Sequence, residues 1–179
     1  RDLATSGYLE RRRKGGTRVP LTPVRKATFS ITIIRQDVEG RGQVHGYRLL
    51  SDRHEAAPPT VRAALKLEKP VELRALVALH LADGKPFCLE RRWINPAFAG
   101  PEVRFETLSA NEWLVRNLAF SGGDFSFHAT PADAELARLL DCAPGAALLA
   151  LERTTFSDAR PITAVTLTYA PGYRMVTEI

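Results

Sequence analysis

Cysteines are scarce in this chain and long apolar runs are absent, and both shortages narrow the possible classes of protein. Only two of the 179 residues are cysteines, Cys88 and Cys142, and they fit no metal-binding spacing, so we expect reduced structural thiols and no metal site. No apolar stretch is long enough to cross a membrane, and no signal-peptide pattern opens the chain. These features predict a cytoplasmic protein without a cofactor.

Positive charge is concentrated near the first residues. Residues 1–26 hold eight Lys or Arg and two acidic residues, a balance of +6, whereas the whole chain carries +5, so residues 27–179 sum to −1. A basic arm on a near-neutral body indicates a polyanionic partner, most often nucleic acid. The body itself, with 45% apolar residues in the whole chain, has the composition of a globular domain.

The basic run lies within a predicted β-ribbon, "GYLERRRKGGTRVP" at residues 7–20. Residues 8–10 and 17–19 are predicted strands, and Gly15 and Gly16 supply the positive φ of a tight turn. Arg13 and Lys14 would then lie at an exposed tip. The chain also opens without Met, on "RDLATSGYLERR", which is typical of the tail of a helix ended by Gly7. We therefore expect a further N-terminal part to precede this chain.

After a short linker with two prolines, predicted strands and helices alternate. Residues 28–34 are either a strand or the start of a helix. The helix over 130–140 is predicted to have Thr130 as its N-cap and Pro131 at its first position. The remaining predicted helices are 57–67 and 109–118, and the predicted strands are 46–51, 71–81, 87–94, 124–129, 147–156 and 162–170.

A unit of one helix and one hairpin occurs twice along the chain. Pro70 and Pro144 are 74 residues apart, and the turn residues Asp83 and Asp158 are 75 apart. Two such hairpins side by side predict an α+β fold with a mainly antiparallel sheet and helices on one face. A sheet with this internal symmetry also leaves a cleft between its halves.

The motifs resemble a known family of regulators. "LATSGYLERRRKGGTRV" resembles the end of the recognition helix and the wing of GntR-type winged helix-turn-helix proteins. "ADGKPFCLERRWINPAFAGPEV", "NEWLVRN", "ADAELARLLDCAPGAALLALERTTF" and "RPITAVTLTYAPGYRM" resemble the UTRA effector-binding domain of the HutC subfamily, whose fold looks like that of chorismate lyase. The resemblance spans about residues 3–175. It implies that residues 1–19 are the remnant of a DNA-binding domain, 20–28 a linker and 29–179 a UTRA domain.

This resemblance implies an effector-binding and dimerisation domain of a transcriptional repressor. "ERRWINP" and "NEWL" are most similar to regulators of histidine utilisation, which respond to urocanate, so a small carboxylate such as urocanate is the expected effector. The implied partners are operator DNA and a second copy of the chain. The wing departs from the family pattern because its cation stands one place forward. The residues implied to contact DNA are Arg13, Lys14, Gly15, Gly16 and Thr17.

The resemblance also implies the residues of the effector pocket. A urocanate-like ligand needs a cation or hydroxyls for its carboxylate, a carboxylate or imidazole for its ring nitrogens, and an aromatic face. The candidates for these roles are, in turn, Arg35 or Arg92, Glu90 or His80, and Trp113 or Tyr169. The full implied set is Ile34, Arg35, Ala78, His80, Glu90, Arg92, Asn111, Trp113, Thr163 and Tyr169.

Structural roles compete with these assignments. His80 could stand at an exposed strand end, Trp113 and Tyr169 could pack in the core, and Glu90 could be an internal salt-bridge partner. Two other functions also stay open: a chorismate lyase-like enzyme acting on a small aromatic acid, and a nucleic-acid binder that uses only the basic arm. No Ser-His-Asp set, metal cluster or pair of carboxylates at suggestive spacing supports the enzyme.

Overall fold

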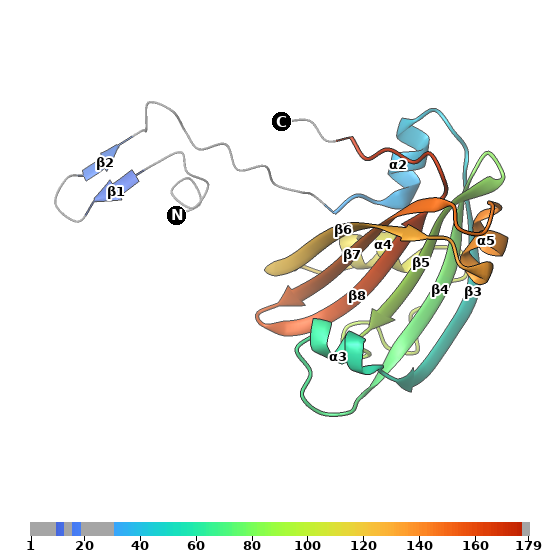
Figure 1. Cartoon of the computed structure of the whole chain (residues 1–179). Helices are drawn as coiled ribbons and strands as arrows, with labels where there is room; N and C mark the ends of the chain where they lie inside the picture. The colour runs from blue at the N-terminus through green and yellow to red at the C-terminus, as the bar shows by residue number, and fades with distance from the viewer. Residues whose placement is uncertain (1–9, 13–15, 19–30, 177–179) are drawn as a thin grey trace. The chain divides into compact units, whose positions relative to one another are not determined.

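The computed structural model describes residues 10–12, 16–18 and 31–176 (Figure 1). Contacts divide the chain into two units, which are described separately, and the larger spans Thr32–Met175. No helix in the described ranges is long and apolar enough to cross a membrane.

The smaller unit contains a two-stranded ribbon. Strand β1, Glu10–Arg12, pairs antiparallel with β2, Gly16–Arg18. The predicted hairpin is therefore confirmed, but its strands differ from the predicted 8–10 and 17–19. Gly16 pairs with Arg12 in the ladder, so it belongs to a strand and not to the turn. Of the residues implied to contact DNA, Gly16 and Thr17 lie in β2, whereas Arg13, Lys14 and Gly15 lie outside the described residues, as does the linker 20–28.

The larger unit is built on one six-stranded antiparallel sheet, as Figure 1 shows. Its strand order is β3-β4-β5-β8-β7-β6, and every neighbouring pair is antiparallel. The predicted α+β class with a mainly antiparallel sheet is confirmed. The strands are β3 His45–Ala56, β4 Glu72–Ala82, β5 Lys85–Ile94, β6 Gly122–Pro131, β7 Ala147–Ser157 and β8 Arg160–Tyr169.

The internal repeat is present in the structure and is longer than the sequence indicated. Each half runs helix, strand, helix, strand, strand, and the two halves meet where β5 pairs with β8. The predicted repeat contained only the second helix and the hairpin of each half. The helices are α2 Ile34–Gly40 and α3 Pro59–Ala64 in the first half, and α4 Ala110–Asn117 and α5 Ala134–Leu140 in the second.

Helices cover both faces of the sheet, whereas the sequence predicted helices on one face. On the first face, Ile34 of α2 shares an apolar cluster with Val165, and Leu114 of α4 shares one with Leu76. Figure 1 shows α4 behind the sheet and α3 in front of it.

The second face is covered by α3 and α5. Leu136 of α5 shares an apolar cluster with Leu79, and Val61 of α3 packs against the cluster that contains Leu73. The reason is visible in β4, where Leu76 points to the first face and Leu79 to the second, and both are buried. A strand with apolar side chains on both faces needs a cover on each.

Both hairpin turns have the predicted residues. Asp83 and Gly84 join β4 to β5 with φ angles of 50° and 77°, and Asp158 and Ala159 join β7 to β8 with φ angles of 46° and 64°. Two positive φ values in a two-residue loop are typical of a type I′ turn, which matches the twist of the strands. The second turn achieves this conformation without a glycine.

The start of α5 was predicted wrongly. Thr130 and Pro131 are not its cap and first residue, because both still pair with β7 as the end of β6. The N-cap is Asp133, whose carboxylate accepts a hydrogen bond of 2.7 Å from the backbone N–H of Leu136. A charged cap three residues further on therefore lets the strand continue through Pro131. The open choice at 28–34 is resolved only at its end, where α2 begins at Ile34.

Candidate functional site

Ionisable side chains are buried in the middle of the first face, near the β5–β8 pair where the two halves meet. We define the polar cluster as six polar residues on this face and on α4, near the β5–β8 pair, that are no more than 5% exposed. Arg74 and Glu112 are equally buried but each has an ion-pair partner of its own outside this set. Burying such groups is costly unless they are paired or serve a ligand. The members are His80 of β4, Glu90 and Arg92 of β5, Asn111 of α4, Arg153 of β7 and Thr163 of β8.

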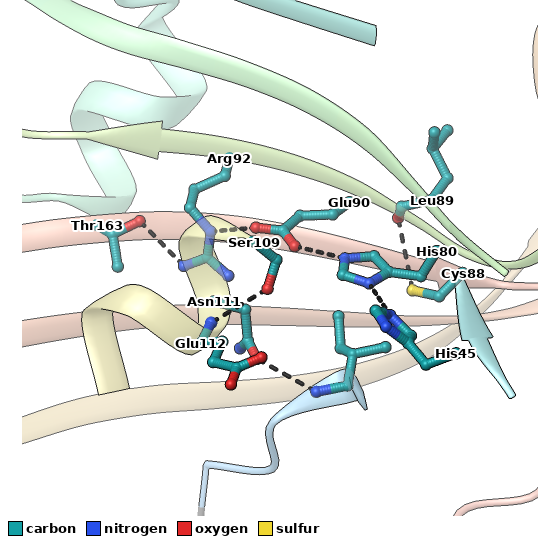
Figure 2. Close-up of polar contacts among 11 residues, drawn as sticks. His45, His80, Cys88, Leu89, Glu90, Arg92, Ser109, Asn111, Glu112 and Thr163 are labelled. Carbon is teal, nitrogen blue, oxygen red and sulfur yellow. Dashed lines mark hydrogen bonds and ion pairs between the residues drawn. The ribbon is translucent and has the colours of Figure 1, made fainter. Parts of the chain in front are cut away.

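Glu90 is the centre of the polar cluster (Figure 2). Its Oε2 lies 2.9 Å from Nε2 of His80, and its Oε1 accepts from Nε of Arg92. Arg92 Nη1 donates over 3.3 Å to the hydroxyl of Thr163, which in turn donates to the carbonyl of Trp93. Burial raises the pKa of Glu90, but the Arg92 charge and the His80 hydrogen bond outweigh it and lower that pKa to about 2. Glu90 is therefore an ionised partner of Arg92.

A second histidine extends this network toward the surface. His45 Nε2, at the half-buried start of β3, lies 3.1 Å from Nδ1 of His80. Because Nε2 of His80 faces a carboxylate, the consistent arrangement has His80 donating from Nε2 and accepting at Nδ1 from His45. Burial, followed by the neighbouring His80, lowers the pKa of His45. The ring N–H groups of His45 and His80 therefore both point inward along this chain of hydrogen bonds, which ends at Glu90.

Three buried N–H groups of the polar cluster have no hydrogen-bond partner among the described residues. They are Nη2 of Arg92, Nδ2 of Asn111 and Nε of Arg153. The oxygen of the Asn111 amide does have a partner, because Oδ1 accepts a hydrogen bond of 3.3 Å from the backbone N–H of Ile34. A buried donor without an acceptor is destabilising, so these groups are suited to bind the oxygen atoms of a ligand. A fourth such atom, Nε of Arg62, belongs to α3 on the second face.

The structure brings most of the implied pocket residues to the first face. Tyr169 is buried there and stacks on Tyr173 with ring centroids 3.8 Å apart. The strand residues on this face follow from the register of β4, β5 and β8, in which partners share a face. The implied residues that gather on this face are Ile34, Ala78, His80, Glu90, Arg92, Asn111, Thr163 and Tyr169.

Arg35 and Trp113 have partners of their own. Arg35 is one-third exposed and donates to Glu112 over 3.0 and 2.8 Å and to Glu39 over 2.8 Å. These carboxylates, Glu112 first, raise the pKa of Arg35. Trp113 packs edge-on against Phe105, with ring centroids 6.2 Å apart, beside an apolar cluster. Of the two cations considered for a ligand carboxylate, Arg92 is the one with a buried N–H that has no partner within residues 31–176.

Arg153 was missed by the sequence reasoning. It pairs with Val165 in the ladder and lies on the first face, with its guanidinium 5.7 Å from the centre of the Phe125 ring. Burial, assisted by the charge of Arg92, lowers the pKa of Arg153 to about 9. A signal was present in "ALLALERTTF", because strand alternation places either Glu152 or Arg153 on the inner face.

The second face carries an open groove of about 600 Å³ between α3 and the strands. The strand residues that line it include Trp93, Asp124, Ser126 and Glu152, and the last three are exposed. None of the ten implied pocket residues lines this groove. No group of three or more His, Cys, Asp or Glu side chains that could hold a metal ion occurs in the described part of the chain.

Comparison with known proteins identifies the class. The UTRA domain family matches residues 40–174. The chain therefore belongs to the UTRA domain family, as the motifs predicted.

Among curated proteins, the chain is similar to the histidine utilization repressor of Pseudomonas putida. The two are 28% identical over 176 residues, which cover 97% of this chain and 71% of the relative. It is also 25% identical to the HTH-type transcriptional repressor NagR of Bacillus subtilis, over 87% of this chain and 65% of that protein. The curated relatives are thus transcriptional repressors, and the chain spans about two thirds of their length.

Solved structures agree on the fold. The C-terminal domain of histidine utilization repressor from Pseudomonas syringae pv. tomato superposes with a TM-score of 0.68 at 24% identity, over 75% of this chain and 98% of that one. PhnF from Mycobacterium smegmatis superposes with a TM-score of 0.70 at 20% identity, over 98% of this chain and 78% of that one.

Proposed function

We propose that the chain is the effector-binding part of a DNA-binding transcriptional repressor of histidine utilisation, and that its effector is urocanate. Membership of the UTRA family and the names of two curated relatives support this assignment. The observation that carries it is the polar cluster, which combines an ionised carboxylate beside an imidazole with three N–H donors that have no partner in the described part of the chain.

The chemistry of urocanate is complementary to this cluster. Its carboxylate can accept from the donors of Arg92 and Asn111 for which the described residues supply no partner. Its ring N–H needs an acceptor, and each Glu90 oxygen, which accepts one hydrogen bond in the structure, has room for another. Val165 and Leu167, buried on the same face, offer an apolar floor for the planar ligand.

Effector binding would act on DNA through α2. This helix follows the predicted linker, and its first residue donates its backbone N–H to Asn111. A ligand that engages Nδ2 of Asn111 would fix the same amide that holds α2, and so favour one arrangement of the elements before it. In the proposed homodimer, this shift would alter how two recognition helices and two basic wings meet a palindromic operator in the cytoplasm. The wing contacts are proposed for residues 13–17.

The ligand is tested by isothermal titration of the chain with urocanate, with histidine and glucosamine 6-phosphate as comparisons. We expect saturable micromolar binding of urocanate only. Asn111→Ala should weaken it at least tenfold, because a hydrogen bond to a charged group is lost. Asn117→Ala is the matched control, since Asn117 is exposed on the same helix and donates to the carbonyl of Trp113.

Two further readouts separate the alternatives. Recovery of unchanged urocanate after incubation is expected of a regulator, whereas its consumption would support the lyase-like enzyme. Sedimentation of the chain reports whether it dimerises. If urocanate produces no heat with the wild-type chain, the urocanate assignment is wrong, although the UTRA fold is unaffected.

A further inference from the structure

We infer that Arg153 and Arg92 together form an anion subsite in which a singly charged carboxylate binds across Val165, with Nδ2 of Asn111 as a further donor. This inference rests on the proposed role of the first face as the effector site. It adds the charge that the effector must carry, and it adds Arg153, which is not among the ten implied pocket residues.

The strand register places the two arginines on either side of one residue. Val165 of β8 is paired with Arg92 of β5 on one side and with Arg153 of β7 on the other. Partners in a sheet share a face, so the two guanidinium groups flank Val165 on the first face. Their Cα atoms are separated by two strand spacings, roughly 10 Å. Two long side chains rising from positions this far apart can hold a small planar group between them.

Charge in the polar cluster is unbalanced without a ligand. The cluster contains two cations, Arg92 and Arg153, and one carboxylate, Glu90. The buried carboxylate of Glu112 on α4 is paired with Arg35 and does not offset them. The two oxygens of Glu90 accept from His80 and Arg92, and neither accepts from Arg153. Within the described residues, Arg153 has no ion pair, and its strand neighbour Glu152 is exposed on the opposite face.

The Phe125 ring does not remove this imbalance. A cation over an aromatic face gains some stabilisation, but a ring cannot accept a hydrogen bond from Nε as a carboxylate does. A buried charge with no counter-ion is among the most costly features of a protein interior. One negative charge would bring the cluster to neutrality and supply acceptors for the unpartnered N–H groups of both arginines. A dianion would leave an excess of negative charge, and an uncharged ester would leave the cation unpaired.

The test compares Arg153→Met with the wild-type chain, using melting temperature and titration calorimetry. The probes are urocanate, its methyl ester and benzoate, which share a flat conjugated framework and differ in charge or ring. Without any ligand, Arg153→Met should melt at a higher temperature than the wild type, because an unpaired buried charge is replaced by an apolar side chain. The same variant should bind urocanate about a hundredfold more weakly and should not distinguish it from the ester.

Arg91→Gln is the matched control. Arg91 is next to Arg92 in β5, but it faces the other way and pairs with exposed Glu135 at 2.8 Å. The affinity of the Arg91→Gln variant for urocanate should equal that of the wild type.

The outcomes separate this inference from the proposed function. If urocanate binds the wild type and Arg153→Met equally, the effector assignment stands and the subsite is wrong. If urocanate does not bind but benzoate raises the melting temperature of the wild type and not of Arg153→Met, the subsite stands and urocanate is wrong. A lower melting temperature for the ligand-free variant would overturn the inference, because Arg153 would then be a structural residue with its charge already compensated.

Discussion

Replacing Glu90 with Gln removes one negative charge from the polar cluster while keeping the size and shape of the side chain. The wild-type carboxylate accepts from both His80 and Arg92. The Gln amide has one oxygen, so one of these donors would face an NH₂ group instead. Arg92 and Arg153 would also remain buried without any anion among the cluster's residues. We therefore predict that Glu90→Gln strongly destabilises the fold.

Two arguments give similar magnitudes for the folding stability that Glu90→Gln loses. Breaking a buried ion pair by removing one partner costs about 3–5 kcal/mol. Separately, the folded state lowers the pKa of Glu90 from 4.5 to about 2, which corresponds to a stabilisation on the order of 3 kcal/mol. For a domain of this size, each kcal/mol shifts the melting temperature by about 2–4 °C. The expected decrease is therefore roughly 10 °C.

The pH dependence follows from the direction of the shift. Because the folded pKa of Glu90 is lowered, its contribution is fully present above the unfolded pKa of 4.5 and is lost as the pH falls toward 2. The stability difference between wild type and Glu90→Gln should thus be constant near neutral pH and shrink below about pH 5. Unfolding by guanidinium, followed by circular dichroism at several pH values, measures this difference.

Glu39→Gln is the control for replacing a carboxylate with an amide at an exposed position. Glu39 pairs with Arg35 on the surface and has a side chain that is 47% exposed. Its replacement should change the melting temperature by no more than about 2 °C. Equal melting temperatures for Glu90→Gln and Glu39→Gln would refute the reasoning, because the buried charges would then not depend on one another.

Three smaller predictions concern the scaffold. Positions 84 and 159 both need a positive φ, which glycine adopts more easily than alanine. Ala159→Gly should therefore stabilise the chain by about 0.5–1 kcal/mol, and Gly84→Ala should destabilise it by about 1 kcal/mol. Melting temperatures that move in the opposite directions would contradict this. Asp133→Ala should cost about 1 kcal/mol by removing the α5 cap, seen in chemical denaturation, and an unchanged midpoint would argue against the cap. Burial raises the pKa of the Cys88 thiol, so Ellman's reagent should modify Cys142 alone in the folded chain and both cysteines in denaturant.

Local signals in the sequence were sufficient for much of the fold. The hairpins were predictable because Asp83 and Asp158 stand in short turns between apolar runs, and turn chemistry acts over a few residues. The cap of α5 was not, since Thr130 and Asp133 are both good N-caps and the choice depends on how far β6 pairs with β7. Which faces receive helices was also not predictable, because that depends on packing between segments far apart in the chain.

The candidate site shows the same division between local and distant information. Alternation along β5 places Glu90 and Arg92 on one face, because period-2 geometry is a property of one strand and can be seen in the sequence alone. Whether a cation in the site already has a partner depends on contacts between distant segments. Arg35 is engaged by Glu112, 77 residues further along, and this pairing left no trace in the spacing of the motifs.

Arg153 also breaks the internal symmetry of the sheet at a position where a ligand can exploit the difference. It follows Ala78 by 75 residues, the same interval that separates the two hairpin turns, so the two residues occupy equivalent places on β7 and β4. Their ladder partners, Glu90 and Val165, are equivalent too. One half therefore presents a small side chain beside an anion, and the other presents a cation beside an apolar residue. A ligand with a carboxylate at one end and a ring N–H at the other matches this asymmetry in only one orientation. A symmetric pair of halves could not select that orientation. The two differences between the halves, Ala78 against Arg153 and Glu90 against Val165, are therefore what would make the site directional.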